Sequence, residues 1–318
     1  MPDRLLSLGG GDSNDLNWLE SDVNLYESSG ETGMYATWSH RWGETQLLLL
    51  LEANLVDFRA RIPWCTLPRT FQHAVNFARR LRIPYLWIDG LCIIQDSTED
   101  WMKQSMEMAS IYEHSFITLA ARAAKNSDEG CFNSYPKDHQ GILDLVRSAN
   151  QNAIAFVRGA SQHPMPSEHL PLLTRRWVFQ ERLLSPRLLH FAHVDLIYEC
   201  NWGTECYCKK QQGATIRSVR SHPPKLQHAN ALGIELFKGV GGHLDAYTER
   251  WCAMIEEYSA LQLTYASDRL PAIAGLARQM ARYMPGARYI SGMWTERLVM
   301  YLSWRRRTNP PTTNGPRF

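Results

Sequence analysis

The sequence predicts an α/β fold, with an open and mostly parallel sheet flanked by helices and a helical C-terminal half packed against it. The apolar stretches "YLWIDGLCII" at 85–94 and "FITLAA" at 116–121 are typical of strands that helices cover on both faces. Stretches with helical periodicity lie before and between them. This alternation is typical of a sheet with right-handed crossover connections, and we expect four or five strands.

The first elements of this sheet follow from local patterns. "MYATWSHRWGE" at 34–44 predicts a short strand that ends in a Trp–Gly turn, and 44–60 predicts a helix. In "LPRTFQHAVNFARRLRIP" at 67–84, apolar residues recur at helical spacing, with Thr70 as a candidate N-cap and Pro84 as the end. This stretch therefore predicts an amphipathic helix directly before a buried strand.

Later elements continue the alternation. Cap-type residues open the stretch 96–114, which has an apolar helical face and predicts a second amphipathic helix. "RRWVFQERLLSPRLLHF" at 175–191 predicts a helix broken at Pro186, and "VDLIYEC" at 194–200 predicts another strand. From residue 246 onward the pattern is helical.

These patterns divide the chain into segments that we expect to pack as one compact unit. The α/β domain covers 34–208 and the helical C-terminal extension covers 246–304. The remaining segments are rich in polar residues, Gly or Pro: a loose N-terminal lead-in at 1–33, an irregular insertion or linker at 209–245, and a disordered tail at 305–318.

Composition limits the function classes. The 34 basic and 32 acidic residues leave a net charge of +2, too balanced for a nucleic-acid surface. The longest apolar run, "LLLLL" at 47–51, is too short to span a membrane. Seven Cys without a scaffold pattern, and an N-terminus without a secretory signal, predict an intracellular, cytoplasmic protein. Eleven Trp favour dense packing or a pocket for an apolar ligand.

Four segments resemble the fungal heterokaryon incompatibility (HET) domain and its usual C-terminal extension. They run from about residue 35 to residue 304 and therefore cover most of the chain. They read "YATWSHRWGE", "RIPYLWIDGLCIIQDSTEDWMKQSMEMASIYEHSFITLAA", "TRRWVFQERLLSPRLLHF" with "LIYEC", and "YSALQLTYASDRLPAIAGLA" with "SGMW".

The resemblance implies a fold and a function. HET domains act in fungal non-self recognition, where they trigger cell death after incompatible cells fuse. They are distantly similar to TIR domains, which have a flavodoxin-like sheet, and some TIR domains cleave NAD with a helix-borne Glu. Here Gln104 stands at the corresponding position, with Glu107 one turn later. A Gln is neither a base nor a charge, and this departure speaks against NAD cleavage.

The first motif also departs from the family. The family usually has Leu-Ser-Tyr-x-Trp-Gly-Asp, whereas this chain has "WSHRWGE" at 38–44, which introduces His40 and Arg41 beside Ser39 and Trp42. Neighbouring residues on a strand point to opposite faces, so Ser39 and His40 do not form a nucleophile–base pair. His40 either acts as an acid or hydrogen-bond donor to a ligand or lies on the surface beside a structural turn.

Asp89 ends the strand "YLWID", at the edge where ligands bind in open sheets. It either lines a crevice or caps the following turn. Trp87 precedes it on the strand and is a candidate for the crevice wall. Cys92 packs as a small hydrophobe unless a cation lowers its pKa.

The motif at 176–182 carries further candidate residues on one helix. Arg176 and Gln180 share one face, and Trp177 and Glu181 share another. They either bind the first motif and Asp89, which would stabilise the fold, or project into the crevice and hold a ligand. The candidate catalytic residues are thus His40, Asp89 and Glu181, and the candidate ligand-binding residues are Ser39, Arg41, Trp42, Trp87, Cys92, Arg176, Trp177 and Gln180.

Cys200, Cys206 and Cys208, with His190 and His193 nearby, are residue types that bind zinc. C-x5-C-x-C is not one of the usual zinc ligand frames, so we expect no metal and no cofactor.

Three functions remain open at this stage. The first is an effector of non-self recognition and cell death, acting by self-association or through a small ligand. The second is a cofactor-independent, pericyclase-like isomerase or cyclase of secondary metabolism, with an apolar intermediate in an aromatic pocket. The third is a TIR-like NAD hydrolase. None of the three involves nucleic acid or a membrane span.

Overall fold

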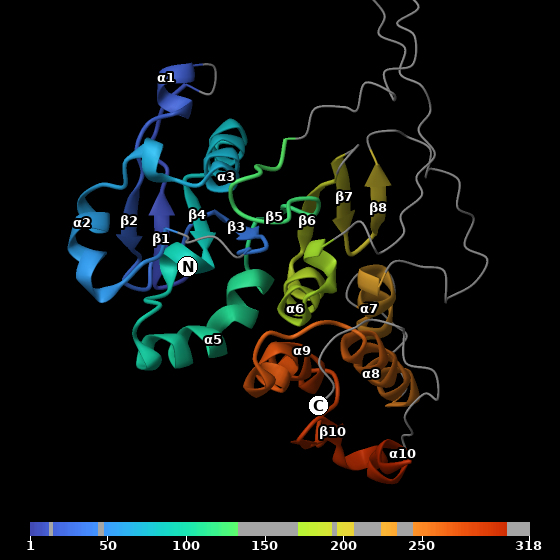
Figure 1. The fold of residues 1–318 in the computed structure, drawn as a ribbon. Coiled ribbons are helices and arrows are strands. Elements are labelled where there is room, and N and C mark those ends of the chain that lie inside the picture. The colour runs from blue at the N-terminus through green and yellow to red at the C-terminus, as the bar shows by residue number, and fades with distance from the viewer. Residues whose placement is uncertain are drawn as a thin grey trace, which may run out of the picture.

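The structure is a computed structural model that describes residues 1–12, 15–43, 48–132, 171–192, 196–206, 224–233 and 244–303. In these ranges eight strands form one sheet in the order β2-β1-β4-β3-β5-β6-β7-β8 (Figure 1). The strands are β1 (Arg4–Ser7), β2 (Asn24–Glu27), β3 (Tyr35–Ser39), β4 (Tyr85–Ile88), β5 (Ile117–Ala120), β6 (Arg187–Phe191), β7 (Leu196–Cys200) and β8 (Gly203–Cys206).

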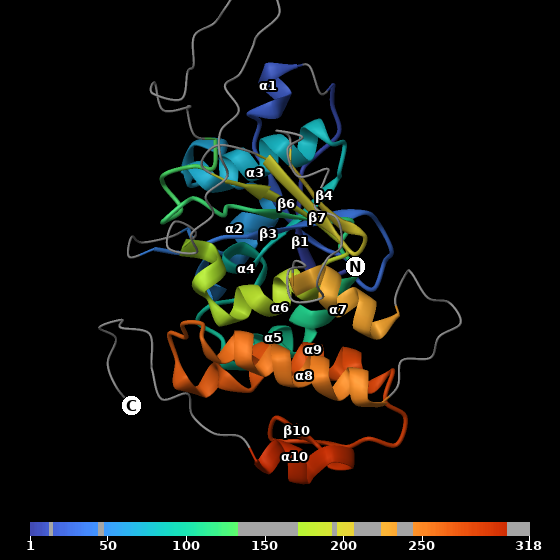
Figure 2. The same cartoon turned by 90° about the vertical axis from the view of Figure 1, so that its right-hand side faces the viewer.

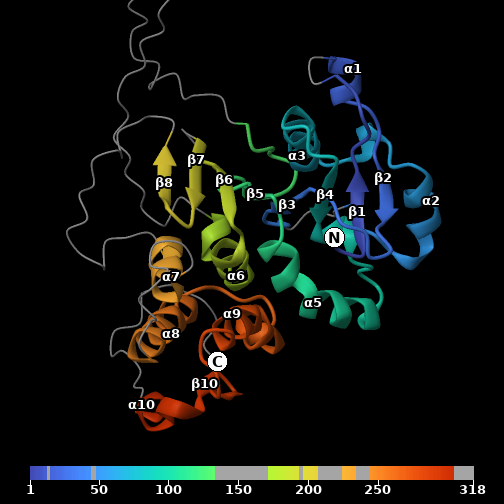
Figure 3. The same cartoon turned by 180° about the vertical axis from the view of Figure 1, so that it is seen from behind.

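The centre of the sheet is parallel and both of its sides are antiparallel. β3 pairs in parallel with β4 and β5, and β5 pairs in parallel with β6. β1 and β2 add an antiparallel pair beside β4, and β7 and β8 add another beside β6, at opposite ends of the sheet (Figure 3). The sequence predicted β3, β4 and β5 of this parallel centre but placed β6 in a broken helix. Its estimate of four or five strands was wrong, because short strands such as β1, β2 and β8 carry little periodicity.

Helices cover both faces of this sheet (Figure 1). On one face α3 (Arg69–Arg80) packs with α2 (Leu55–Ala60) over a core that contains Trp38. On the other face α5 (Thr98–Glu113) and α6 (Arg176–Leu184) pack over a core that contains Trp87. Short helical segments complete these layers: α1 (Leu16–Leu19), α4 (Asp89–Cys92), and the 3-10 turns η1 (Glu52–Asn54), η2 (Trp64–Thr66) and η5 (Pro171–Thr174).

The C-terminal residues form a further layer beneath α5 and α6 (Figure 2). α9 contacts both α5 and α6, and Trp251 and Met254 of α8 belong to the same apolar core as Phe179 of α6. The elements of this layer are α7 (Pro224–Leu232), α8 (Leu244–Ser259), η7 (Ala266–Arg269), α9 (Pro271–Ala281), β9 (Tyr289–Ile290), β10 (Met293–Trp294), η8 (Thr295–Arg297) and α10 (Leu298–Leu302).

Some segments differ from their predicted structure. The stretch at 175–191 is a helix that ends at Leu184 and a strand that begins at Arg187, because Pro186 cannot continue the helix. Part of the predicted linker, from Pro224, is helical. The segments 44–47, 209–223, 234–243 and 304–318 lie outside the described residues. Within the described ranges, none of the helices has the length and apolar character needed to cross a lipid bilayer.

The first 33 residues are not a loose lead-in, since they contribute β1 and β2 to the sheet. Arg79 of α3 holds this segment in place. Its Nε donates to the carbonyl of Leu8 at 2.9 Å, its Nη1 to Leu19 at 3.1 Å and Ser21 at 2.9 Å, and its Nη2 to Asp22 at 3.1 Å. The guanidinium also lies 5.5 Å from the ring centroid of Trp18. These contacts between distant segments have no signature in local sequence.

Replacing Arg79 by Ala is expected to detach the N-terminal strands. Four carbonyl groups would lose a charged donor, and the free energy of unfolding should fall by about 3 kcal/mol or more. Urea unfolding measures the loss, and hydrogen exchange of the β1 and β2 amides locates it. Arg80→Ala is the matched control, because Arg80 is exposed and its guanidinium donates to the neighbouring side chain of Asn76. Unchanged protection of β1 and β2 in Arg79→Ala would contradict the assignment.

Candidate functional site

The carboxyl ends of β3 and β4 bring together side chains from three distant segments. Ser39 ends β3 and His40 follows it, Asp89 follows β4, and Glu181 comes from α6. The chain returns from β3 to β4 through α3 on one face, and from β4 to β5 through α5 on the other (Figure 1). The carboxyl edge at which such connections diverge is the usual ligand position in an open α/β sheet.

Ser39 and Glu181 form the buried half of this site. The Ser39 hydroxyl donates to Oε2 of Glu181 at 2.5 Å, and both residues are buried. Burial raises the pKa of Glu181 to about 7, with the negative charge of Asp89 acting in the same direction. Hydrogen bonds from Ser39 and Tyr112 and the charge of Arg175 oppose this rise. Glu181 therefore exchanges a proton near neutral pH, which is what a general acid or base requires.

His40 and Asp89 form the second half. Nδ1 of His40 lies 3.8 Å from Oδ1 of Asp89, too far for a hydrogen bond. The imidazole ring packs edge-to-face on Phe71 at 4.9 Å, and its Nε2 is buried with no partner in the described chain. Burial lowers the pKa of His40 to about 4, with Asp89 opposing and Arg175 adding to the effect. His40 is therefore neutral at pH 7.

Asp89 is the accessible carboxylate of the group, with 27 % of its side chain exposed. Its Oδ2 accepts a hydrogen bond from Nε1 of Trp42 at 2.8 Å, and its Oδ1 accepts from the amide of Gly90 at 2.8 Å. Asp89 thus closes the turn after β4 and also faces His40, whereas its role in lining a ligand crevice stays a prediction.

Ser39 and His40 occupy opposite faces of the sheet, as strand alternation predicted. The Ser39 hydroxyl points to α6, whereas the His40 ring packs on Phe71 of α3. The two side chains therefore do not form a nucleophile–base pair with each other.

Residues 35–181 match the family model described as heterokaryon incompatibility protein (HET). This match supports a HET-domain protein, the family that the sequence motifs resemble. No curated protein and no solved structure matches the chain. All four site residues, Ser39, His40, Asp89 and Glu181, fall within the HET match.

Two further residues of the site, Arg175 and Tyr112, were missed by sequence reasoning. Nη1 of Arg175 donates to the backbone carbonyl of His40 at 3.0 Å, and Tyr112 of α5 hydrogen-bonds Glu181. Arg175 directly precedes the dense motif on α6, so its position in the sequence could have marked it as a candidate site residue. Tyr112 belongs to an apolar helix face, where nothing in the sequence distinguishes it from core packing.

Three predicted ligand-binding residues differ from one another in their surroundings. Trp87 is fully buried and packs edge-to-face on Tyr112, with ring centroids 5.7 Å apart. Cys92 is buried, its sulfur accepts from the amide of Ile88 at 3.5 Å, and burial raises its pKa to about 12, so it packs as a hydrophobe. Arg41 is exposed just beyond β3. Glu44, the last residue of the first motif, lies outside the described residues.

The other α6 residues bind the C-terminal layer instead of the first motif. Arg176 donates to the carbonyls of Leu261 at 2.9 Å and Ser259 at 3.3 Å. The indole of Trp177 donates to Asp268 at 3.1 Å, and the side-chain oxygen of Gln180 accepts from the amide of Gly275 at 2.8 Å. The HET match ends at Glu181, so contacts from residues beyond the match hold its last helix in position.

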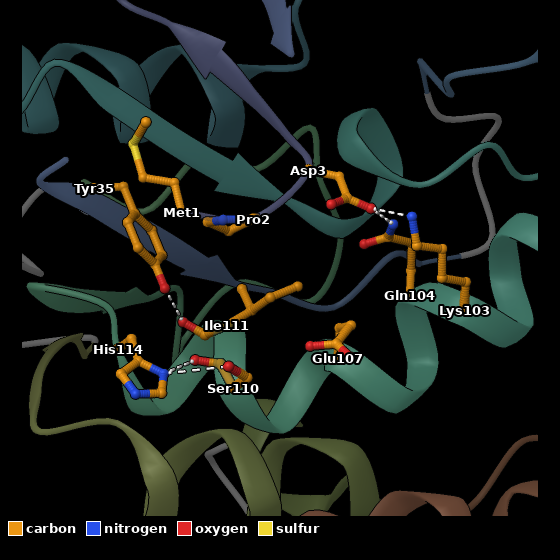
Figure 4. A pocket seen from close by; sticks show the side chains of 10 residues that line it. All are labelled: Met1, Pro2, Asp3, Tyr35, Lys103, Gln104, Glu107, Ser110, Ile111 and His114. Atoms are coloured by element: carbon orange, nitrogen blue, oxygen red, sulfur yellow. Dashed lines mark hydrogen bonds and ion pairs between the residues drawn. The ribbon is translucent and has the colours of Figure 1, made fainter. Parts of the chain in front are cut away.

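Gln104 and Glu107, at the TIR-like position, line a different cavity of about 290 Å³ near the amino end of β3 (Figure 4). Gln104 is buried and donates to Asp3 at 3.0 Å, whereas Glu107 is exposed. The cavity is lined by Met1, Pro2, Asp3, Tyr35, Lys103, Gln104, Glu107, Ser110, Ile111 and His114. These two residues share their cavity with Tyr35, which begins β3, whereas Ser39 ends that strand.

The proposed zinc ligands do not come together in the described part of the chain. His190 lies 3.0 Å from Glu199, and no group of three metal-ligating side chains occurs in the searched ranges. His193 and Cys208 lie outside the described residues, and the side chain of Cys206 is not described.

Replacing Glu181 by Gln is expected to change how stability depends on pH. Between pH 4.5 and about 7 the folded state keeps a proton on Glu181 that the unfolded state releases. The stability contribution is therefore complete below pH 4.5 and is lost as pH rises through 7, by about 3 kcal/mol in total. Gln accepts the Ser39 bond without titrating, so Glu181→Gln should gain stability relative to wild type as pH rises. Urea unfolding from pH 5 to 8 measures this difference.

His40 provides the internal control for that experiment. Its folded pKa of about 4 lies below its ordinary value of 6.5, so its contribution is lost as pH falls below 6.5. Glu181→Gln should leave this acid-side loss intact. Parallel stability curves for wild type and variant between pH 5 and 8 would rule out a raised pKa at Glu181.

Replacing Gly275 by Ala tests the contact between α6 and α9. In an open helix this change stabilises by up to about 1 kcal/mol. Here the added Cβ would overlap Ala109 and lie 2.5 Å from Oε1 of Gln180, so we expect a loss of about 1–3 kcal/mol instead. Thermal unfolding gives the sign. Ala281→Gly at the exposed end of α9 calibrates helix propensity, and a stabilised Gly275→Ala variant would contradict the close packing.

Proposed function

We propose that this HET-domain protein is a cytoplasmic effector of fungal non-self recognition that triggers cell death. The observation that carries the proposal is the coincidence of the family match with the carboxyl-edge site. Ser39, His40, Asp89 and Glu181 all lie within residues 35–181, and the fold brings them together from three segments. In this proposal the effector acts by self-association or through a small ligand at that edge.

The strand order supports the TIR-like part of the proposal. The four parallel strands lie in the order β4-β3-β5-β6, which is second, first, third and fourth along the chain. Flavodoxin-like sheets have this order and bind their ligands at the switch point of the strand order. In this sheet the corresponding point lies between β3 and β5. Ser39 stands at that point, because the amide of Ala121, after β5, donates to its carbonyl at 2.9 Å.

Growth of a fungal host tests the effector function. Induced expression of the full chain is expected to arrest growth, and Glu181→Gln and Ser39→Ala are expected to restore most of it because both changes remove the proton-exchanging pair. Glu107→Gln, at an exposed residue outside the site, should arrest growth like wild type. Colony counts at matched protein levels are the measurement. Normal growth with the wild-type chain would contradict the effector function.

A second candidate is supported by the neutral groups at the edge. A protonated Glu181 and a neutral His40 beside Phe71 are suited to hydrogen-bonding a developing negative charge without a cofactor. This is the chemistry of a cofactor-independent, pericyclase-like isomerase or cyclase of secondary metabolism. Expression of the wild-type chain should then change the proportions of the isomers of an apolar metabolite at constant mass. Expression of Glu181→Gln should leave these proportions unchanged. An unchanged isomer profile in a producing host would remove this candidate.

NAD hydrolysis has the weakest support. The residue at the TIR-like position, Gln104, is uncharged and donates to Asp3. Of the two carboxylates that line this cavity, Asp3 is paired with Lys103 and Glu107 is exposed. Nicotinamide release from NAD by purified wild type, and its loss in Glu107→Gln, would overturn this ranking.

A further inference from the structure

A second cluster of buried charges surrounds Glu199 of β7. Nε and Nη2 of Arg182 donate to its two oxygens, each at 2.8 Å, and Nε2 of His190 lies 3.0 Å from Oε2. Burial would raise the pKa of Glu199, but Arg182 and His190 together hold it well below its ordinary value. Glu199 is therefore ionised, and its carboxylate already serves two partners.

Lys225 of α7 adds a positive charge to this cluster, and the partners of its ammonium group are backbone carbonyls. Its ammonium donates to the backbone carbonyls of Arg182 at 3.0 Å and Leu183 at 3.2 Å, and also to that of Ser185. Burial lowers its pKa to about 8, with Glu199 opposing, so most of the group is charged at pH 7.

Arg122 is a further cation of this region, and no carboxylate among the described residues forms an ion pair with it. It follows β5, and its neighbours Ala121 and Ala123 bond the carbonyls of Ser39 at 2.9 Å and Phe191 at 3.1 Å, which places it at the carboxyl ends of β3, β5 and β6. Its guanidinium is half-buried and makes no hydrogen bond or ion pair with another described residue, and its Nε is buried without a partner.

The surroundings of Arg122 hold an excess of positive charge. Burial lowers the pKa of Arg122 to about 10, Arg182 lowers it further, and Glu199 is the carboxylate that opposes them. Glu257, the other acid that acts on Arg182, is paired with Arg250 at 3.0 Å. Burial also lowers the pKa of His190, and its Nδ1 is buried without a partner among the described residues. An uncompensated charge in a partly buried place is costly unless an anion approaches.

We propose that Arg122 binds an anionic group, a carboxylate or a phosphate, at the carboxyl ends of β5 and β6. The planar guanidinium fork matches both kinds of oxyanion, and the positive charge of Arg182 acts on the same place, with Glu199 opposing it. A bound anion favours protonation of His190, whose Nδ1 then becomes a donor. The proposal does not rest on the effector function, since it concerns a cluster apart from the Ser39–Glu181 pair.

Thermal unfolding of the full chain with added anions tests this site. Sodium phosphate and sodium succinate are titrated separately at constant ionic strength, with chloride as the balancing salt. We expect a saturable rise in Tm with at least one of them, and about tenfold weaker half-saturation in Arg122→Gln. The arm that saturates distinguishes phosphate from carboxylate. Arg187→Gln is the matched control, because Arg187 is an exposed cation at the start of β6.

Two outcomes overturn the proposal. One is a Tm that rises without saturation and equally in wild type and Arg122→Gln, which is a general salt effect. The other is loss of the response in Arg187→Gln to the same extent.

A measurement on the wild-type chain keeps the test independent of whether Arg122→Gln folds. Histidine NMR should show the pKa of His190 rising on addition of the anion that saturates. An unchanged His190 titration at saturating phosphate and at saturating succinate would also overturn the proposal.

Discussion

The hydrogen bond between Ser39 and Glu181 joins the sheet to α6 and, through that helix, to the C-terminal layer. Glu181 lies on α6, and the neighbouring residues of that helix bind the loop at 259–262, Asp268 and Gly275 of the C-terminal layer. The position of one buried carboxyl therefore depends on α9 as much as on β3. The HET match covers the sheet side of this contact, whereas the residues that fix the far side of α6 lie beyond it.

Burial controls the chemistry available at this edge. Glu181 and His40 are both shielded from water, and in each case burial favours the uncharged form, which for Glu181 means a raised pKa and for His40 a lowered one. The charges at the edge are therefore on the more accessible Asp89 and on the guanidinium of Arg175. A site of this kind combines neutral hydrogen-bonding groups inside with ionic groups at its mouth.

Side chains of opposite charge follow neighbouring strands along the carboxyl edge of the sheet. The end of β4 presents the carboxylate of Asp89, and the ends of β5 and β6 present Arg122 with Arg182 behind it. We propose that such a gradient orients a ligand that has one polar, uncharged part and one anionic part. It arises because crossover connections bring strand ends from distant segments into one row.

The sequence by itself determined β3, β4 and β5 of the parallel centre, the helices α3 and α5 beside them, and the opposite directions of Ser39 and His40, because these follow from local periodicity. It also placed Asp89 at a strand end. Tertiary structure alone decided which α6 side chains reach the site, since helical spacing gives Arg176, Gln180 and Glu181 a face but not a partner. The same holds for the strands of the first 33 residues, which depend on Arg79, and for Arg122, whose lack of a partner is visible only once the chain is folded.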